Sequence, residues 1–143
     1  MKKISDLVDL SKDPVIDDLE EFQFGSVYPF QGQQIAISTG VNIAGARKLI
    51  NVYGIRHALK RHGNHTLEQL DNQIGLQDSD FNLIPGILSN PDSVQRGTDT
   101  NRGNKVLKFI KIINGHTYIV IMTFFLGGRK GPKLEFDTMY IKQ

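Results

Sequence analysis

The C-terminal half of the chain has the β-branched and alternating pattern of strands. Residues 104–125, NKVLKFIKIINGHTYIVIMTFF, form two apolar runs joined by Asn-Gly, which is the strongest short signal of a β-hairpin. Residues 133–143 predict a last strand, and residues 93–98 are suited to a first one. We therefore predict an antiparallel meander of three to four strands in this half.

The N-terminal half is dominated by helical signals. Residues 43–62 predict one long helix, with cap candidates in Ser-Thr-Gly before it, Gly63 as its C′ residue and a break near Gly54. Residues 4–10 and 15–22 are consistent with helical turns or a capped arm.

Shorter elements complete this half. FQFGSVYPF (22–30) and QQIAIST (33–39) are consistent with two strands, broken by Pro29 and Gly32. Residues 66–75 predict a short helix capped by Thr66, and Pro85 fits the first turn of another. The fold class is therefore α+β, with N-terminal helices packed on the meander.

The last predicted strand carries hydroxyl groups at its end. With a period of two, Leu134, Phe136, Thr138 and Tyr140 share one face, and the intervening residues share the other. Thr138 and Tyr140 could donate hydrogen bonds to a phosphate, or Tyr140 could stack on a base. An ordinary edge threonine and rim tyrosine would give the same pattern.

Charge is unevenly distributed along the 143 residues, although the net charge is only +2. Residues 41–62 and 93–143 together carry a net charge of +11, and the remainder carries −9. This asymmetry favours a basic face for a polyanion such as RNA or DNA, unless the two charge sets pair across the surface. The chain has no cysteine and no apolar run of the ~20 residues that cross a bilayer, so we expect a cytoplasmic protein without membrane contact.

The stretch IRHALKRHG (55–63) places His57 and His62 in a basic helix end. Histidine suits proton transfer because its unperturbed pKa of ~6.5 lies near neutral pH. On an ideal helix the two rings would lie ~140° apart, so they can share a target only if the helix ends or tightens near His62. One of the two could instead be structural.

Cationic residues lie in or beside turns of the basic half. As phosphate ligands we consider Arg61, Arg102, Lys105, Arg129 and Lys130.

A metal site is a weaker alternative. His57, His62 and His65 have the spacing H-x4-H-x2-H, to which Asp71 or Asp78 could add a ligand, but the i, i+4 pair of helical zinc motifs is missing. His116 follows the hairpin turn and fits exposed polarity. We predict no metal and no other cofactor.

These motifs as a set resemble the phage barnase–EndoU–colicin–RelE-like (BECR fold) nuclease domains, which occur in phage, mobile-element and polymorphic-toxin proteins. The similarity covers residues 35–143 and rests on IRHALKRHG, DFNLIPGILSNPDSV, the basic meander and the terminal DTMY. It implies helices on a four-stranded antiparallel sheet and metal-independent RNA cleavage. His57 and His62 match the paired histidines, Thr138 the hydroxyl of the last strand, and Tyr140 the aromatic residue that follows.

We therefore predict an endoribonuclease that acts through 2′-hydroxyl attack, as a toxin or phage effector, on tRNA or another structured RNA. An immunity or antitoxin protein is an expected partner. A non-catalytic nucleic-acid-binding module, or a degenerate phage accessory domain, would fit the same charge pattern. Residues 1–34 are expected to form an N-terminal arm or cap beside the nuclease-like domain of residues 35–143.

Overall fold

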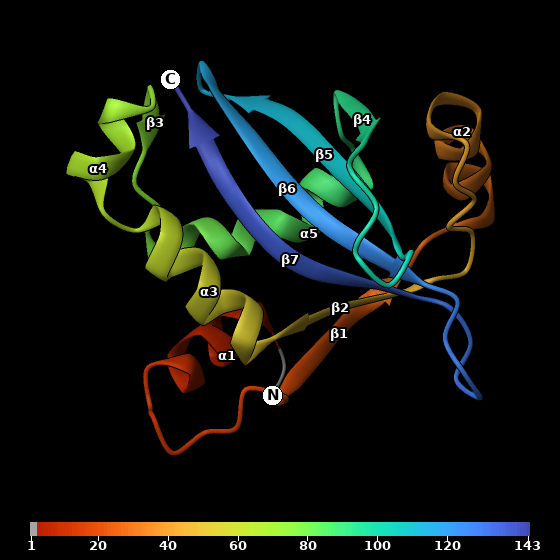
Figure 1. Ribbon diagram of the computed structural model, residues 1–143, viewed down its shortest axis with the longest axis horizontal. Helices are drawn as coiled ribbons and strands as arrows, with labels where there is room; N and C mark the ends of the chain where they lie inside the picture. The colour runs from red at the N-terminus through yellow and green to blue at the C-terminus, as the bar shows by residue number, and fades with distance from the viewer. Residues whose placement is uncertain (1–2) are drawn as a thin grey trace.

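The computed structural model describes residues 3–143 and has the mixed α+β architecture predicted (Figure 1). The helices are α1 (Ile4–Ser11), α2 (Pro29–Thr39), α3 (Val52–His62), α4 (His65–Leu70), the 3₁₀ turn η1 (Asp78–Leu83) and α5 (Ile84–Ser89). The strands are β1 (Glu21–Ser26), β2 (Arg47–Asn51), β3 (Gln73–Ile74), β4 (Ser93–Arg96), β5 (Lys105–Ile113), β6 (His116–Phe125) and β7 (Lys133–Lys142).

All of these strands belong to one seven-stranded sheet, which is larger than the predicted meander. Its order is β1-β2-β7-β6-β5-β4, and β3 pairs with the end of β7. Strands β4 to β7 are consecutive antiparallel neighbours, whereas β2 pairs in parallel with residues 133–135 of β7. Because β2 and β3 pair only with the two ends of β7, its middle has no strand on that side.

The β5–β6 hairpin is confirmed. Ile113 pairs with His116, so Asn114 and Gly115 form the whole connection. Both have positive φ angles, 51° and 80°, as a two-residue hairpin loop requires.

The predicted helix over 43–62 is wrong in its first part. Residues 47–51 form β2, and α3 begins only at Val52. The run from Lys48 to Val52 is buried throughout, as in a strand covered on both faces. Asn51 caps the helix, because its side-chain oxygen accepts a hydrogen bond from Gly54 N at 2.8 Å. Gly63 follows the last helical residue with a φ of −82°, so it does not take the left-handed C′ conformation.

Two other local predictions are also wrong. Residues 33–39 belong to helix α2, in which Pro29 occupies the first turn and Gly40 ends the helix in the left-handed conformation. The cap of α4 is Asn64 rather than Thr66, since Asn64 Oδ1 accepts from Leu67 N at 3.1 Å. Residues 15–20 form turns that lead into β1.

A β-bulge overturns the predicted faces of β7. Ile121 pairs with Thr138 but Met122 pairs with Phe136, so Asp137 is an extra residue in β7. The alternation therefore changes phase at this point. The side chains that enter the core are Leu134, Phe136, Met139 and Ile141.

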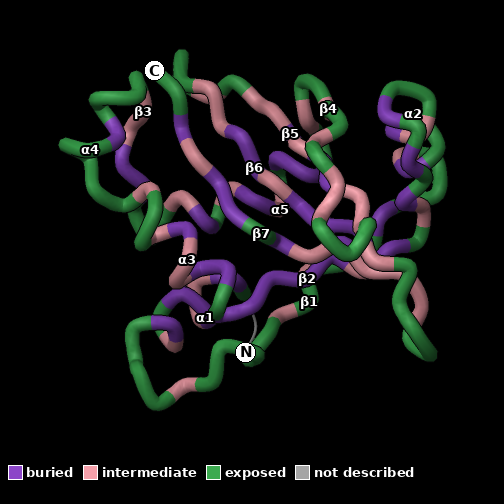
Figure 2. The backbone as a smooth tube through the Cα atoms, in the orientation of Figure 1, coloured by how far each residue is buried: buried purple, intermediate pink, exposed green. Residues whose placement is uncertain are grey.

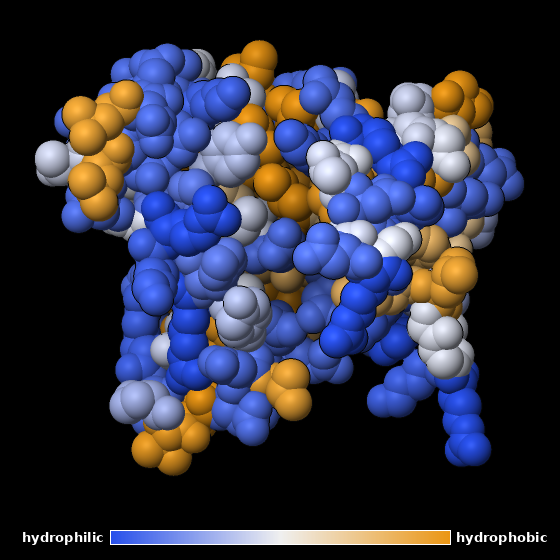
Figure 3. Space-filling model, viewed as in Figure 1, coloured by the Kyte–Doolittle hydropathy of each residue, from blue (hydrophilic) through white to orange (hydrophobic). Residues whose placement is uncertain are grey.

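The two faces of the sheet differ in what covers them. One face packs on the helices and carries the core, which includes residues of α1, α3 and α5 (Figures 1 and 2). We call the other face the open face, and Figure 1 shows it toward the viewer with α5 behind the strands. By register it carries Glu135, Thr138 and Tyr140 of β7, Ile119, Ile121 and Thr123 of β6, and Val106, Lys108 and Ile110 of β5. Hydrophobic side chains lie recessed in its middle between hydrophilic ones (Figure 3).

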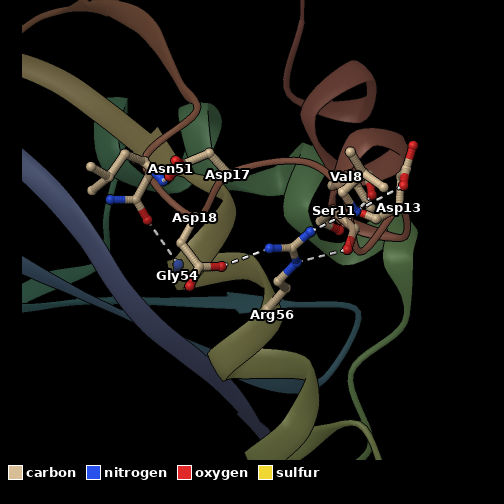
Figure 4. Close-up of polar contacts among 10 residues, drawn as sticks. Val8, Ser11, Asp13, Asp17, Asp18, Asn51, Gly54 and Arg56 are labelled. Atoms are coloured by element: carbon tan, nitrogen blue, oxygen red, sulfur yellow. Dashed lines mark hydrogen bonds and ion pairs between the residues drawn. The ribbon is translucent and has the colours of Figure 1, made fainter.

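Residues 3–34 pack against the rest of the chain. Ile4, Leu7 and Val8 of α1 belong to the common hydrophobic core, and β1 pairs with β2. An arginine fixes this segment to α3. Arg56 donates to the backbone oxygens of Ser11 and Asp13 and to the Asp18 carboxylate, at 3.0, 2.7 and 2.6 Å (Figure 4).

Lys48 gives a test of this packing. It is 8% exposed, its ammonium nitrogen lies 5.7 Å from the centroid of the Phe24 ring, and burial lowers the pKa of its ammonium group. The unfolded chain therefore binds more protons than the folded chain between the folded and unfolded pKa values of Lys48, and stability rises with pH in that window. We expect Lys48→Met to raise the free energy of unfolding at pH 7 by about 1 kcal/mol.

Urea denaturation at pH 7 and at pH values approaching 10 measures this effect. The advantage of Lys48→Met should shrink as pH rises, because the wild-type lysine loses its charge. Lys60→Met, at an exposed position of α3, is the matched control and should change little. A Lys48→Met protein less stable than wild type at pH 7 contradicts this view of the buried ammonium group.

Candidate active site

Helix α3 lies along the unpaired middle of β7 and runs in the same direction. Near the helix start, Gly54 is so close to Phe136 that a Cβ atom would lie 2.9 Å from the phenyl ring. Near its end, the rings of His62 and Tyr140 have centroids 5.5 Å apart. The outer side of α3 and the open face of β7 are therefore adjacent, and together with the recessed middle of that face (Figure 3) they form the surface that we call the groove.

His62 is held by a buried carboxylate. Its Nδ1 lies 3.0 Å from Oε2 of Glu68, and the two side chains are only 14% and 6% exposed. A carboxylate accepts hydrogen bonds, so Nδ1 donates and Nε2 is left as the atom that can exchange a proton with a ligand. Glu68 comes from α4, which Asn64 caps just after α3 ends.

Tyr140 supports the other side of the same imidazole. Its ring is tilted by 32° to the His62 ring and is half-buried on the open face. The structure thus brings together His62 and Tyr140, two of the residues selected from the sequence. The two rings therefore meet where the end of α3 approaches the open face of β7.

His57 lies one turn earlier on α3, on its outer side. It stacks on Tyr53 with a centroid distance of 5.6 Å and an interplanar angle of 13°. Tyr53, His57 and Arg61 are four residues apart and therefore follow one stripe of the helix. Along the helix, His57 lies between Gly54 and His62, which lie next to Phe136 and Tyr140 of β7.

Thr138 lies on the open face just after the bulge, and its hydroxyl group is buried without a hydrogen bond to the described residues. The residue is 7% exposed, and Oγ1 has no hydrogen-bond partner among residues 3–143. Buried hydroxyls are normally paired, since an unpaired one costs about 1–3 kcal/mol.

Lys108 is a cation of the open face that the sequence did not single out. It pairs in register with Ile121, which pairs with Thr138, so the three residues form one row across β5, β6 and β7. Lys108 is half-buried, and no ion pair or hydrogen bond of its ammonium group is found in the described part of the chain. Neighbouring strands are about 4.8 Å apart, so the backbones of Lys108 and Thr138 are separated by about 10 Å across the sheet.

The cationic residues that the sequence suggested as phosphate ligands lie at different places in the fold. Arg61 is exposed in the last turn of α3. Arg102 is exposed in the loop 97–104, which connects β4 to β5. Arg129 and Lys130 lie in the β6–β7 loop, at the opposite end of β7 from Tyr140.

Among these suggested phosphate ligands, Lys105 forms an ion pair with another residue of the chain, Asp99. Its ammonium group lies 2.8 Å from Asp99, and hydrogen bonds from Lys105 and Arg96 lower the pKa of that carboxyl group. By alternation Lys105 points to the opposite face from Lys108. The structure therefore does not bring Lys105 to the groove.

The three histidines considered for a metal have separate partners. His57 stacks on Tyr53 and His62 contacts Glu68, whereas Nδ1 of His65 accepts a hydrogen bond from Gly75 N at 3.1 Å. Within residues 3–143, no group of three or more His, Asp or Glu side chains is placed to hold a metal ion.

Comparison with known proteins assigns the chain to a nuclease family. The family model described as phage-Barnase-EndoU-ColicinE5/D-RelE like nuclease 3 matches residues 25–143, and the chain belongs to that family. The search of curated proteins and the search of solved structures found no match to the chain. Among residues 3–143, none of the helices has both the length and the apolar character needed to span a bilayer.

The free energy of unfolding tests whether the Thr138 hydroxyl lacks a hydrogen bond. Thr138→Val removes a hydroxyl without removing a hydrogen bond, so the free energy of unfolding should stay unchanged or rise by up to about 1 kcal/mol. Thr39→Val is the matched control, since Thr39 is also buried but its hydroxyl donates to Ile35 O at 2.7 Å. Urea denaturation should show the control destabilised by about 1 kcal/mol. An equal loss in both variants contradicts the assignment of an unpaired hydroxyl.

Proposed function

We propose that this nuclease cleaves RNA by attack of the 2′-hydroxyl on the neighbouring phosphate. The observation that carries the proposal is the arrangement of His62 between Glu68 and Tyr140 at the wall of the groove. An imidazole with one nitrogen fixed by a carboxylate and the other free is suited to proton transfer. RNA provides its own nucleophile, so two proton-transfer groups and a positively charged phosphate site suffice for this chemistry.

In this proposal one histidine removes a proton and the other donates one. Nε2 of His62 takes the proton of the 2′-hydroxyl, and the Glu68 carboxylate stabilises the imidazolium that forms. The 2′ oxygen then bonds to phosphorus, and the bond to the 5′ oxygen breaks. His57 protonates that leaving oxygen, which yields a 2′,3′-cyclic phosphate and a 5′-hydroxyl.

The phosphate is bound from the open face. Lys108 has an unpaired charge in the row that leads to Thr138, and the Tyr140 ring is next to the His62 ring. Arg61 and Arg102 add cations at the rim. A structured RNA such as tRNA is the proposed substrate, and a toxin or phage-effector role with an immunity partner fits the family's range.

The two histidines and Glu68 give a graded prediction for activity. His62→Gln and His57→Gln should each lower kcat for a single-stranded RNA oligonucleotide by about 100- to 10,000-fold, the usual worth of general acid–base catalysis. Glu68→Gln should lower kcat less and change the pH–rate profile, because the amide cannot stabilise an imidazolium in the same way. His116→Gln, at the exposed first residue of β6, is the control and should act as wild type.

Binding measurements separate catalysis from affinity. The histidine variants should retain RNA affinity within a few-fold in fluorescence anisotropy. Wild-type protein that binds RNA with salt-dependent affinity but never cleaves it supports the binding-module alternative and contradicts the proposal.

Lys108 gives an independent test of the phosphate site. Lys108→Met should weaken RNA binding and reduce the slope of log K against log salt by about 0.7, the value expected for one lost phosphate contact on a single strand. Lys111→Met removes the same charge from the same strand, but Lys111 already donates to Asn90 O at 2.8 Å. The Lys111 variant should therefore keep the slope, and equal slopes in the two variants contradict the assignment.

A further inference from the structure

A small pocket lies beside the groove, at the beginning of α3. Its volume is about 140 Å³. Three aromatic side chains and four polar ones line it: Tyr53, Phe125, Phe136, Asn51, Thr123, Glu135 and Asp137. Tyr53 stacks on His57, and Asp137 precedes Thr138, so the pocket adjoins the proposed catalytic groups.

Part of the polar lining is already occupied. Asn51 Nδ2 donates to Oε1 of Glu135 at 2.7 Å, and the Lys133 ammonium lies 3.2 Å from Oε2 of the same carboxylate. The same ammonium also lies 4.9 Å from the centroid of the Phe125 ring. These contacts fix Glu135 as part of the wall and leave its oxygens little capacity for a ligand.

Two other polar side chains in the lining have free bonding capacity. Asp137 is exposed on the bulge, and its carboxylate has no hydrogen bond or ion pair among the described residues. Thr123 is 7% exposed, and its hydroxyl takes part in none of the side-chain hydrogen bonds found there. The pocket therefore offers an acceptor-rich wall between aromatic rings.

We propose that this pocket binds the base of a nucleotide next to the scissile phosphate and selects bases that carry an exocyclic amino group. This inference rests on the proposed function. Aromatic walls stack on any base, but the Asp137 carboxylate accepts hydrogen bonds only. Adenine, cytosine and guanine present an N–H₂ group with two N–H donors, whereas the pairing edge of uracil has a single N3–H donor between two carbonyl oxygens that repel a carboxylate.

Charge and size argue against other ligands. Glu135 and Asp137 place two carboxylates in the lining, and among residues 3–143 the one cation paired with them is Lys133, so a phosphate group is disfavoured there. Ligand pockets for larger molecules are about 300–1,000 Å³, and this volume suits a single planar ring system.

The test is to map cleavage sites in a randomised single-stranded RNA 12-mer by sequencing the products. At one position flanking the cut, uridine should be depleted about 5- to 100-fold, the discrimination that a good base contact provides. Asp137→Asn should remove most of this depletion, because an amide can both donate and accept. Asp9→Asn, an exposed aspartate of α1, is the control and should keep the wild-type preference.

The outcomes separate this inference from the proposed function. Cleavage with no base preference, or a preference that Asp137→Asn leaves intact, overturns the base pocket but leaves the ribonuclease. If wild-type protein cleaves no RNA, the proposed function fails and the pocket is judged by NMR titration with the four nucleoside monophosphates. Equal shifts of the Asp137 amide with UMP and with CMP then overturn the pocket.

Discussion

The contact between α3 and the middle of β7 is the constraint on which the rest of the site depends. β2 and β3 pair with the two ends of β7, and the helix fills the gap that they leave. Gly54 permits this approach because any side chain would meet Phe136. The Asp137 bulge then turns Thr138 and Tyr140 away from the core and toward the groove. Without the bulge, those hydroxyls would lie under the helices.

Several polar groups around this contact have no partner for a hydrogen bond or a charge within residues 3–143. His62 has one ring nitrogen engaged by Glu68, Thr138 has a buried hydroxyl without a partner, and Lys108 has no counter-ion among the described residues. Such unsatisfied groups are costly in a folded protein, and they concentrate where a ligand supplies the missing partner. Lys108 and Thr138 lie in one row across the sheet, and His62 lies at the end of α3. These positions relate the fold to the proposed chemistry on nucleic acid.

The sequence predicted the mixed α+β class and the β5–β6 hairpin, because these depend on local pattern. His62 and Tyr140 were separate candidates, and the contact between their rings follows from the tertiary fold. The prediction from sequence failed at β2, where a doubly buried strand resembles the start of a helix, and at α2, where β-branched residues sit in a helix begun by proline. The bulge has no signature in the period-two pattern of β7. Glu68 and Lys108 depend on tertiary register: one reaches His62 from the next helix, and the other is one of several lysines of β5.

The central claim is that two imidazoles in this groove catalyse cleavage by the RNA's own 2′-hydroxyl. The most direct measurement is mass spectrometry of the fragments formed from an RNA oligonucleotide in the presence of a chelator, with a fully 2′-O-methylated strand as the comparison. If the 2′-hydroxyl is the nucleophile, the RNA yields 2′,3′-cyclic phosphate ends and the methylated strand stays intact. Cleavage of the methylated strand, or ends that carry a 5′-phosphate, contradicts it.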